Sequence, residues 1–288
     1  MYFLGLAGYP LEHSSSPRLH TAALRACNLE GEYKLYSLEC ADGLRPLLAR
    51  VRAGEIWGLN VTIPYKRAVM PLLDELTPTA RAIGSVNVIY WDGSDLVGDN
   101  TDAPGFWAAL AEMAFDHAVV FPENRRALVL GAGGAARAVV YALAQHGWNV
   151  HIAARRLSQA RQLAADLGSF FPAAQFSTST FRVVRSPDCE LVVNATPVGS
   201  AALNTDVSPW PRGWQFPPRA IVYDLVYSPL ETVFVHQARI AGLPARTGLS
   251  MLIEQAALAF ELWTGEMPPR NVMRAAVGVK RVLPNACE

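Results

Sequence analysis

The fold of this 288-residue chain is decided by the segment Val129-Leu130-Gly131-Ala132-Gly133-Gly134-Ala135-Ala136-Arg137. It fits the pattern G-x-G-x-x-G/A, in which the first glycine allows a tight turn and the second lets backbone N–H groups approach a pyrophosphate. The segment follows an apolar run at 127–130 and opens an alanine-rich run at 135–146. A buried strand that turns through glycines into a helix predicts a dinucleotide-binding βαβ unit. The loop residues expected to bind the cofactor are Gly131, Ala132, Gly133, Gly134 and Ala135.

Strand and helix patterns alternate around this unit, which predicts an α/β fold with a parallel, doubly wound sheet. Downstream we expect strands at 149–153, 191–194 and 221–225, a helix at 157–167, and mostly helix from about residue 228. Upstream we expect strands at 2–7, 33–38 and 58–63, helices at 17–26, 44–53, 65–73 and 101–113, and a hairpin of 86–90 with 96–98. Ser16 is the expected N-cap of the helix at 17–26. Since the dinucleotide unit starts only at 127, the first domain is expected to bind the substrate.

Composition excludes several classes of protein. Hydrophobic residues make up 51% of the chain and charged residues 17%, which indicates a globular protein. The 25 basic and 25 acidic residues form no basic block, so neither nucleic acid nor a membrane surface is an expected partner. No apolar run approaches the roughly 18 residues of a membrane span, and 1–7 is interpreted as a strand and not as a signal peptide. The four cysteines lack metal-ligand spacing, which predicts reduced thiols in the cytoplasm and no metal site.

The second strand of the dinucleotide unit indicates which cofactor binds. NAD-binding proteins usually carry an acidic residue near its end, but here the chain reads Ala153-Ala154-Arg155-Arg156. A planar guanidinium can bind a 2′-phosphate through two hydrogen bonds, so Arg155 and Arg156 predict NADP(H). The alternative is that both arginines are solvated at the start of a helix.

Four polar clusters lie in the first hundred residues. They read GYPLEHSSSP at 8–17, NVTIPYK at 60–66, GSVN at 84–87 and GDNTD at 98–102. Each lies where an expected strand meets a turn or a helix, and loops on a rigid scaffold often hold ligand-binding groups. Their hydroxyls, amides, one lysine and one carboxylate suit a small polyhydroxylated acid. Taken alone, Lys66 could instead be a solvated lysine, and Asp102 the N-cap of the next helix.

These clusters resemble the shikimate/quinate dehydrogenase family, which carries G-x-P-x-x-H-S-x-S-P, N-V-T-x-P-x-K and G-x-N-T-D in this order. The similarity continues through NATPVG at 194–199, DLVYSP at 224–229 and GLSMLIEQA at 248–256. It implies two α/β domains and an NADPH-dependent, reversible reduction of 3-dehydroshikimate to shikimate on the route to chorismate and the aromatic amino acids. The boundaries we expect are 1–103 for the substrate domain, 104–236 for the Rossmann domain, and 237–288 for C-terminal helices that pack on the first domain.

The resemblance also implies a role for individual side chains. The catalytic pair would be Lys66 and Asp102. The expected substrate-binding residues are Ser14 and Ser16 for the carboxylate, Thr62, Asn87, Asp102 and Gln255 for the hydroxyls, and Tyr227 close by. The further cofactor-binding residues are Thr196, Val226, Gly248 and Met251, the last two at the nicotinamide end. Monomer and homodimer are both left open.

The chain departs from the family pattern at two places. The usual Asn-Arg-Thr adenosine motif with a later arginine is replaced by Ala154-Arg155-Arg156, and Gln159 holds the place of the later arginine. The usual His-Asn pair after the serine motif is His20-Thr21. The first departure leaves the strength of the NADP preference open.

Three other functions stay open at this point. A quinate or dual quinate/shikimate dehydrogenase would share the fold, although a threonine in place of Ser16 would favour quinate. A catalytically silent shikimate sensor is disfavoured by Lys66 and Asp102. Another NADP dehydrogenase in which a lysine acts as the acid, such as a folate enzyme, is disfavoured by the two-serine loop.

Overall fold

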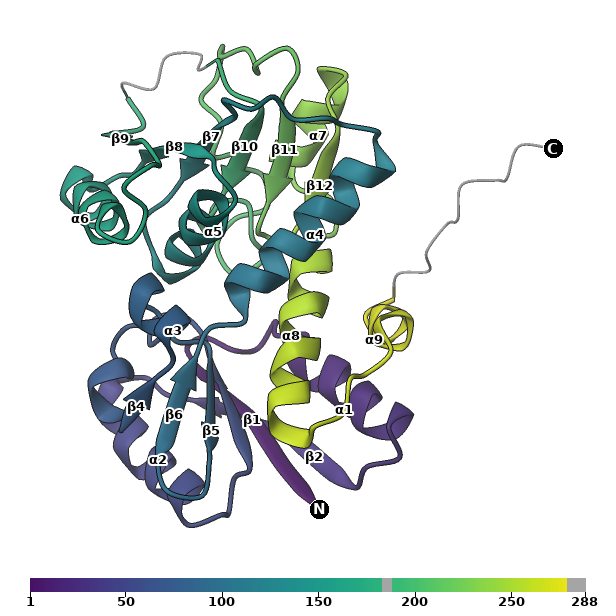
Figure 1. The fold of residues 1–288 in the computed structure, drawn as a ribbon. Coiled ribbons are helices and arrows are strands. Elements are labelled where there is room, and N and C mark those ends of the chain that lie inside the picture. The colour runs from purple at the N-terminus through teal and green to yellow at the C-terminus, as the bar shows by residue number, and fades with distance from the viewer. Residues whose placement is uncertain (183–187, 279–288) are drawn as a thin grey trace.

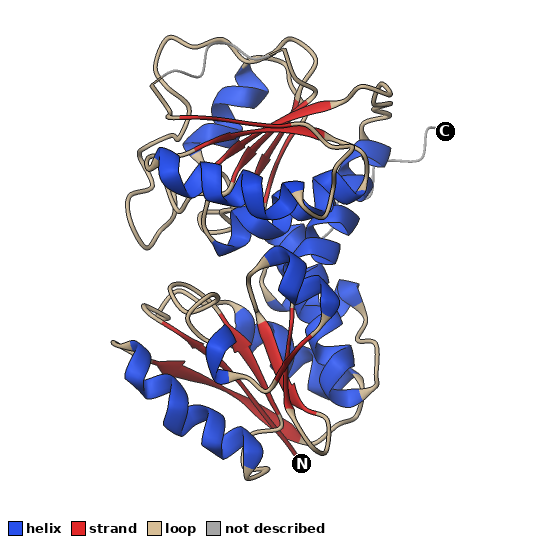
Figure 2. Ribbon diagram, turned by 60° about the vertical axis from the view of Figure 1, so that its left-hand side comes forward, coloured by secondary structure: helices blue, strands red, loops and turns tan. Residues whose placement is uncertain are grey.

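The computed structural model describes residues 1–182 and 188–278 as two α/β domains joined by two long helices (Figure 1). Each domain is built on its own sheet, and Figure 2 shows the two sheets in separate lobes with helices packed against both. The predicted α/β class is confirmed. No helix within the described ranges is both long and apolar enough to cross a membrane.

The first sheet has the strand order β2-β1-β3-β5-β6-β4. Its strands are β1 (Tyr2–Gly8), β2 (Gly31–Ser37), β3 (Gly58–Val61), β4 (Glu75–Leu76), β5 (Val88–Trp91) and β6 (Leu96–Asp99). Strand β1 is parallel to β2 and β3, whereas β5 is antiparallel to both β3 and β6, as expected for the hairpin. The helices are α1 (Ser16–Ala26), α2 (Leu44–Arg52) and α3 (Pro78–Ile83). Strands β1, β3 and β6 therefore point the same way, so the loops after them meet at one edge.

The second sheet has the strand order β12-β11-β10-β7-β8-β9, and its pairs are all parallel. Its strands are β7 (Arg126–Leu130), β8 (Asn149–Ala153), β9 (Phe176–Ser179), β10 (Leu191–Asn194), β11 (Ile221–Asp224) and β12 (Ala245–Thr247). The helices α5 (Gly134–Gln145), α6 (Leu157–Gly168) and α7 (Val233–Ile240) follow its strands. The chain winds from β7 in opposite directions to β8 and β10, and ligands of such sheets bind at this switch point.

Helices α4 (Asp102–Asp116) and α8 (Leu249–Thr264) pack on each other and run between the two domains (Figure 1). Helix α8 returns to the first domain, where Phe260 is fully buried with Leu4 and Leu19. Both α8 and α9 (Arg270–Ala276) pack on α1. Because β12 extends the second sheet to Thr247, beyond the expected boundary at 236, we propose that the Rossmann domain ends between β12 and α8.

Two expectations were wrong. The segment 65–73 forms turns and a short 3₁₀ helix, Met70–Leu72, because Pro71 lacks the N–H that a continuing α-helix needs. Helix α1 starts at Ser16 with Ser15 at the N-cap, so Ser16 is not the cap. Trp57 of the first domain is 51% exposed and donates its indole N–H to the Trp263 carbonyl at 2.6 Å.

Candidate active site

Lys66 and Asp102 form a shielded ion pair where the two domains meet. The Lys66 Nζ donates a hydrogen bond to the Asp102 Oδ2, and the side chains are 13% and 6% exposed. Lys66 lies in the loop after β3, and Asp102 is the first residue of α4, close after β6. The alternatives of a solvated lysine and an N-cap aspartate are therefore wrong, since Thr101 holds the N-cap position. Charges in such surroundings interact more strongly than they do in water.

Asn87 connects the Lys66–Asp102 pair to Gln255 on helix α8. Its Nδ2 lies 3.0 Å from the Asp102 Oδ1, 2.9 Å from the Thr101 Oγ1 and 3.2 Å from the Gln255 Oε1. Gln255 belongs to α8, which packs closely on α4 because Gly105 has no side chain. A Cβ at Gly105 would lie 2.8 Å from the Gln255 backbone nitrogen. The fold thus brings Lys66, Asn87, Asp102 and Gln255 together from four separate segments.

Two residues that the sequence did not point to extend this network. Asn60 donates from its Nδ2 to the Asn87 carbonyl at 3.1 Å and accepts a 2.8 Å hydrogen bond from the Tyr33 hydroxyl. The His20 ring is fully buried and stacks on Tyr33 with the ring centroids 4.4 Å apart, which gives His20 a packing role. Asn60 heads the NVTIPYK cluster and could have been singled out from it. Nothing in the sequence distinguishes Tyr33 from other strand aromatics.

The two-serine loop reaches the same network. The Ser16 backbone N–H donates to the Ser14 Oγ at 3.3 Å, which places the Ser14 hydroxyl at the start of α1. Burial raises the pKa of Tyr33 well above its usual value, and a hydrogen bond with the Ser16 side chain works against this shift. Burial also raises the pKa of Tyr227, whose phenol is hydrogen-bonded by the backbone of Ser15. Tyr227 follows β11, so a residue of the second domain meets the serine loop of the first.

Thr62 belongs to the same edge of the first sheet. It follows β3, and its backbone N–H donates to the Ala7 carbonyl at the end of β1 at 2.9 Å. All the predicted substrate-binding residues therefore lie at this edge or on the elements that meet it.

The glycine loop lies directly against Lys66. Gly131 has φ +119°, and its N–H donates to the Ala153 carbonyl at 2.7 Å. The space over Gly133 is open, with no atom within 4 Å of where a Cβ would lie, at the start of the 12-residue helix α5. An open, glycine-lined helix N-terminus fits a pyrophosphate group. A Cβ on Gly134, in contrast, would lie 2.9 Å from the Ser85 Oγ and 3.2 Å from the Lys66 Cβ.

The other predicted cofactor residues follow neighbouring strands of the second sheet. Arg155 and Arg156 are exposed after β8, at the start of α6. Thr196 follows β10 and donates from its N–H and Oγ1 to the Asn194 Oδ1, at 3.0 and 2.6 Å. Val226 follows β11, and its carbonyl accepts from the Gly248 N–H at 3.0 Å. Met251 is buried in the first turn of α8.

Comparison with known proteins identifies the family. Residues 6–89 match the model of the shikimate dehydrogenase substrate-binding domain, and residues 248–277 match that of the shikimate 5′-dehydrogenase C-terminal domain. The NADP⁺ shikimate dehydrogenase of Salinibacter ruber is 44% identical over 276 residues, which cover 94% of this chain and 95% of that protein. The chain belongs to the shikimate dehydrogenase family. The resemblance inferred from its motifs is thereby confirmed.

Solved structures of shikimate dehydrogenases have the same fold. One in complex with NADP⁺ superposes with a TM-score of 0.87 at 35% identity, covering 96% of this chain and 94% of the other. The Thermus thermophilus enzyme, in complex with NADP(H) and shikimate, gives 0.83 at 38% identity and coverages of 96% and 98%. A quinate dehydrogenase of Corynebacterium glutamicum in complex with NAD gives 0.83 at 33% identity, with coverages of 96% and 98%.

A second buried network, around Asp224, fixes the loops after β10 and β11 in this family member. The Asp224 Oδ1 accepts from the Asn194 Nδ2 at 2.8 Å and from the Val226 N–H at 3.0 Å, and its Oδ2 accepts from the Thr232 Oγ1 at 2.7 Å. Burial raises the pKa of the Asp224 carboxyl from 3.8 to about 6, although these three hydrogen bonds act in the opposite direction. The carboxylate is thus costly to ionise in the fold.

This raised pKa gives a stability that depends on pH. Between the two pKa values the folded chain holds a proton that the unfolded chain has lost, so the contribution is complete below pH 3.8 and is lost as pH rises through about 6. A shift of about two units corresponds to about 3 kcal/mol of unfolding free energy. We expect the wild type to lose stability between about pH 4 and pH 7 relative to Asp224→Asn, measured by urea unfolding. Equal pH slopes for the wild type, Asp224→Asn and the exposed control Asp42→Asn would contradict this.

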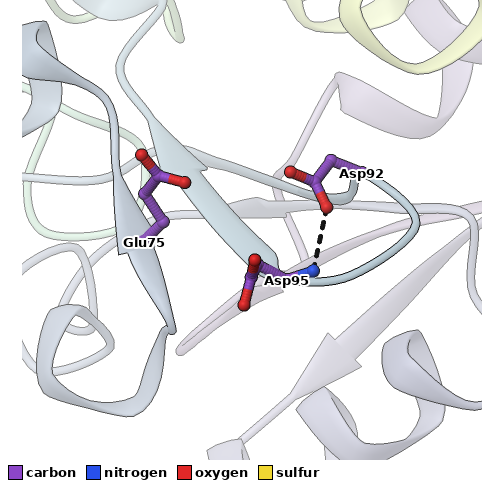
Figure 3. A group of neighbouring side chains, drawn as sticks. All are labelled: Glu75, Asp92 and Asp95. Carbon is purple, nitrogen blue, oxygen red and sulfur yellow. Dashed lines mark hydrogen bonds between the residues drawn. The ribbon is translucent and has the colours of Figure 1, made fainter.

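Three acidic side chains gather away from this site, at the β5–β6 turn (Figure 3). Oxygens of Glu75, Asp92 and Asp95 lie within 4.8 Å of one another. The Asp92 carboxylate accepts hydrogen bonds from the Ser94 and Asp95 N–H groups, at 2.9 and 2.8 Å. These bonds close the turn of the hairpin, and we therefore interpret the cluster as structural.

Proposed function

We propose that the chain is an NADP(H)-dependent shikimate dehydrogenase that reversibly reduces 3-dehydroshikimate to shikimate. The observation that carries this proposal is the shielded Lys66–Asp102 pair. The glycine loop of the second domain lies against Lys66, and hydrogen bonds through Asn87, Asn60 and Tyr33 connect Asp102 to the two-serine loop of the first domain. A polar substrate site and a dinucleotide site that share one lysine suit hydride transfer to a ketone. The family membership and the NADP⁺ named for the Salinibacter relative support the same reaction.

The chemistry follows from the charge that develops on the substrate. When bound, the nicotinamide supplies the hydride for the C3 carbonyl carbon. The carbonyl oxygen then gains negative charge. The Lys66 ammonium would stabilise this charge and then donate a proton to the oxygen. Asp102 would hold the ammonium in place and accept a hydrogen bond from a substrate hydroxyl. General acid–base assistance of this kind contributes about 10²–10⁴-fold to the rate.

The remaining predicted residues would orient the substrate. Ser14 and Ser16 would bind its carboxylate, and Thr62, Asn87 and Gln255 would hold the hydroxyls. Tyr227 would close the site from the second domain. Asn87 already donates to Asp102, so it would connect hydroxyl binding to the position of the catalytic pair.

Arg155 and Arg156 would bind the 2′-phosphate of NADP(H). Hydrogen bonds to charged groups contribute about 1.5–3 kcal/mol, so Arg155→Ala should lower the kcat/KM ratio of NADP⁺ over NAD⁺ by about 10–100-fold. Arg161→Ala, which removes an exposed arginine of α6, is the matched control and should leave the ratio unchanged. The initial rates at limiting cofactor measure this ratio. A wild type that prefers NAD⁺ would overturn the assignment.

The function itself is tested by the initial rate of NADP⁺ reduction with shikimate, with quinate and with no acid, repeated with NAD⁺. We expect shikimate with NADP⁺ to give the highest kcat/KM. Quinate as the better substrate would favour the quinate branch, to which the similar Corynebacterium structure belongs. Binding of shikimate without turnover would favour a sensor.

We also propose a cytoplasmic enzyme. Cys27, Cys40 and Cys189 are unpaired thiols, as expected in a reducing compartment. Cys287 lies outside the described residues. For its oligomeric state, a monomer or a homodimer stays the prediction.

A further inference from the structure

Arg137 is a buried arginine to which the proposed reaction assigns no role. It is the last residue of the glycine segment, lies in the first turn of α5 and is 4% exposed. Its Nε donates to the Ile83 carbonyl in the first domain, and its Nη2 donates to the Asp166 Oδ2 on α6 at 2.7 Å. Burying a guanidinium is costly unless such partners satisfy it. The two contacts therefore hold α5 and α6 of the second domain against the end of α3.

The end of α3 leads directly to the catalytic groups. Three residues after Ile83, the Val86 N–H donates to the Lys66 carbonyl at 2.8 Å. The next residue, Asn87, donates to the Asp102 Oδ1. The segment 83–87 thus fixes the backbone of one catalytic residue and the side chain of the other.

Arg137 and Gly134 act on this segment from one face of α5. They are three positions apart, and residues at this spacing are neighbours on a helix. Gly134 lies against Ser85 and the Lys66 stem, whereas Arg137 binds Ile83. The contact of Gly134 with the Lys66 stem limits how near the glycine loop comes to Lys66. The hydrogen bond from Arg137 to the Ile83 carbonyl keeps the glycine loop from moving away from Lys66.

We propose that Arg137 is a positioning residue that holds the cofactor loop in register with the Lys66–Asp102 pair. It touches neither the substrate nor the cofactor in the proposed function, on which this inference rests. Its effect is on the geometry of hydride transfer, for which a misplacement of about 1 Å can cost about 100-fold in rate. Binding of shikimate and of NADP⁺, which use other side chains, depends on it much less.

Arg137→Ala and Arg137→Lys test this role, with Arg161→Ala as the matched control. We expect Arg137→Ala to lower kcat by about 10–100-fold. The KM for shikimate and the Kd for NADP⁺ should change less than about threefold. The kinetic isotope effect of shikimate deuterated at C3 should rise, because hydride transfer becomes more rate-limiting. A rise in KM or Kd with an unchanged kcat and isotope effect would overturn the proposal.

Two further measurements separate positioning from general loss of structure. A pocket of about 540 Å³, lined by Arg67, Arg81, Gly84 and Arg137 among others, gives small molecules access to the Arg137 guanidinium. Added guanidinium should therefore restore part of the kcat of Arg137→Ala and none in the wild type or Arg161→Ala. Arg137→Lys, which keeps the charge, should be intermediate. The proposal would be contradicted if added guanidinium restored no kcat to Arg137→Ala and Arg137→Lys were no more active than Arg137→Ala, with thermal stability unchanged in both variants.

Amide hydrogen exchange gives a readout that is independent of turnover. Exchange within 83–87 should rise in Arg137→Ala, while exchange in β7 and in β1 should not. If the wild type does not oxidise shikimate, the proposed function fails on its own, and the exchange data still decide whether Arg137 holds this segment. Unchanged exchange within 83–87 would refute the inference.

Discussion

Lys66→Ala is expected to lower kcat for shikimate oxidation by about 10²–10⁴-fold. The ammonium is the only cation that contacts the Asp102 carboxylate among the described residues, and the glycine loop lies against its stem. Without it, the charge on the substrate oxygen has no partner and no proton donor. The KM for shikimate should change less, because the serines and amides that would bind the acid remain.

The control is Lys34→Ala, which removes an exposed lysine paired with Glu32 on β2 and should leave kcat unchanged. Lys66→Ala also leaves Asp102 buried without its partner, and removal of one member of a buried pair can destabilise a fold by about 3–5 kcal/mol. Thermal unfolding must therefore be measured alongside turnover. A folded Lys66→Ala enzyme with nearly wild-type kcat would refute the assignment of Lys66 as the acid.

The fold was largely predictable because its strongest signals are local. The strand–glycine–helix segment at 127–146 combines burial, turn chemistry and helix propensity, and all three agree. The segment 65–73 is not an α-helix because Pro71 lacks the N–H that a continuous helix needs, and it forms turns and the 3₁₀ helix Met70–Leu72 instead. The strands β4, β9 and β12 were missed because each is short and contains at most one large apolar residue. A strand of that length shows no clear alternation, and only pairing with its neighbour defines it.

The site could be predicted only where a motif concentrates the polar residues. Lys66 and Asp102 were proposed from separate clusters, but their ion pair depends on the two loops meeting at one sheet edge. Tyr33 and Arg137 could not be found in this way. Each is a single residue in an ordinary strand or helix, and its partner comes from a distant segment, Asn60 in one case and Ile83 in the other. Contacts of this kind depend on tertiary packing, and no periodic pattern of residues in the sequence predicts them.

Gly134→Ala and Gly133→Ala are expected to affect different kinetic constants, although the two glycines are adjacent. A Cβ at 134 would lie 2.9 Å from the Ser85 Oγ and 3.2 Å from the Lys66 Cβ, so the loop or the lysine must move. Such a shift should lower kcat by about 10²-fold. A Cβ at 133 meets no protein atom within 4 Å and projects into the space proposed for the pyrophosphate. That substitution should raise the Kd for NADP⁺ and change the kcat at saturation much less.

The contrast between these two variants tests the shared geometry of the site more directly than either variant alone. If the glycine loop only bound the cofactor, both substitutions would raise the Kd for NADP⁺ and neither would change kcat at saturation. If the loop also sets the position of Lys66, Gly134→Ala should lower kcat even when NADP⁺ is saturating. Steady-state kinetics at saturating and limiting NADP⁺ separate the two cases. A pure Kd effect in Gly134→Ala would mean that the lysine stem tolerates the added methyl group, and that the close contact of the two domains at this point does not control the reaction.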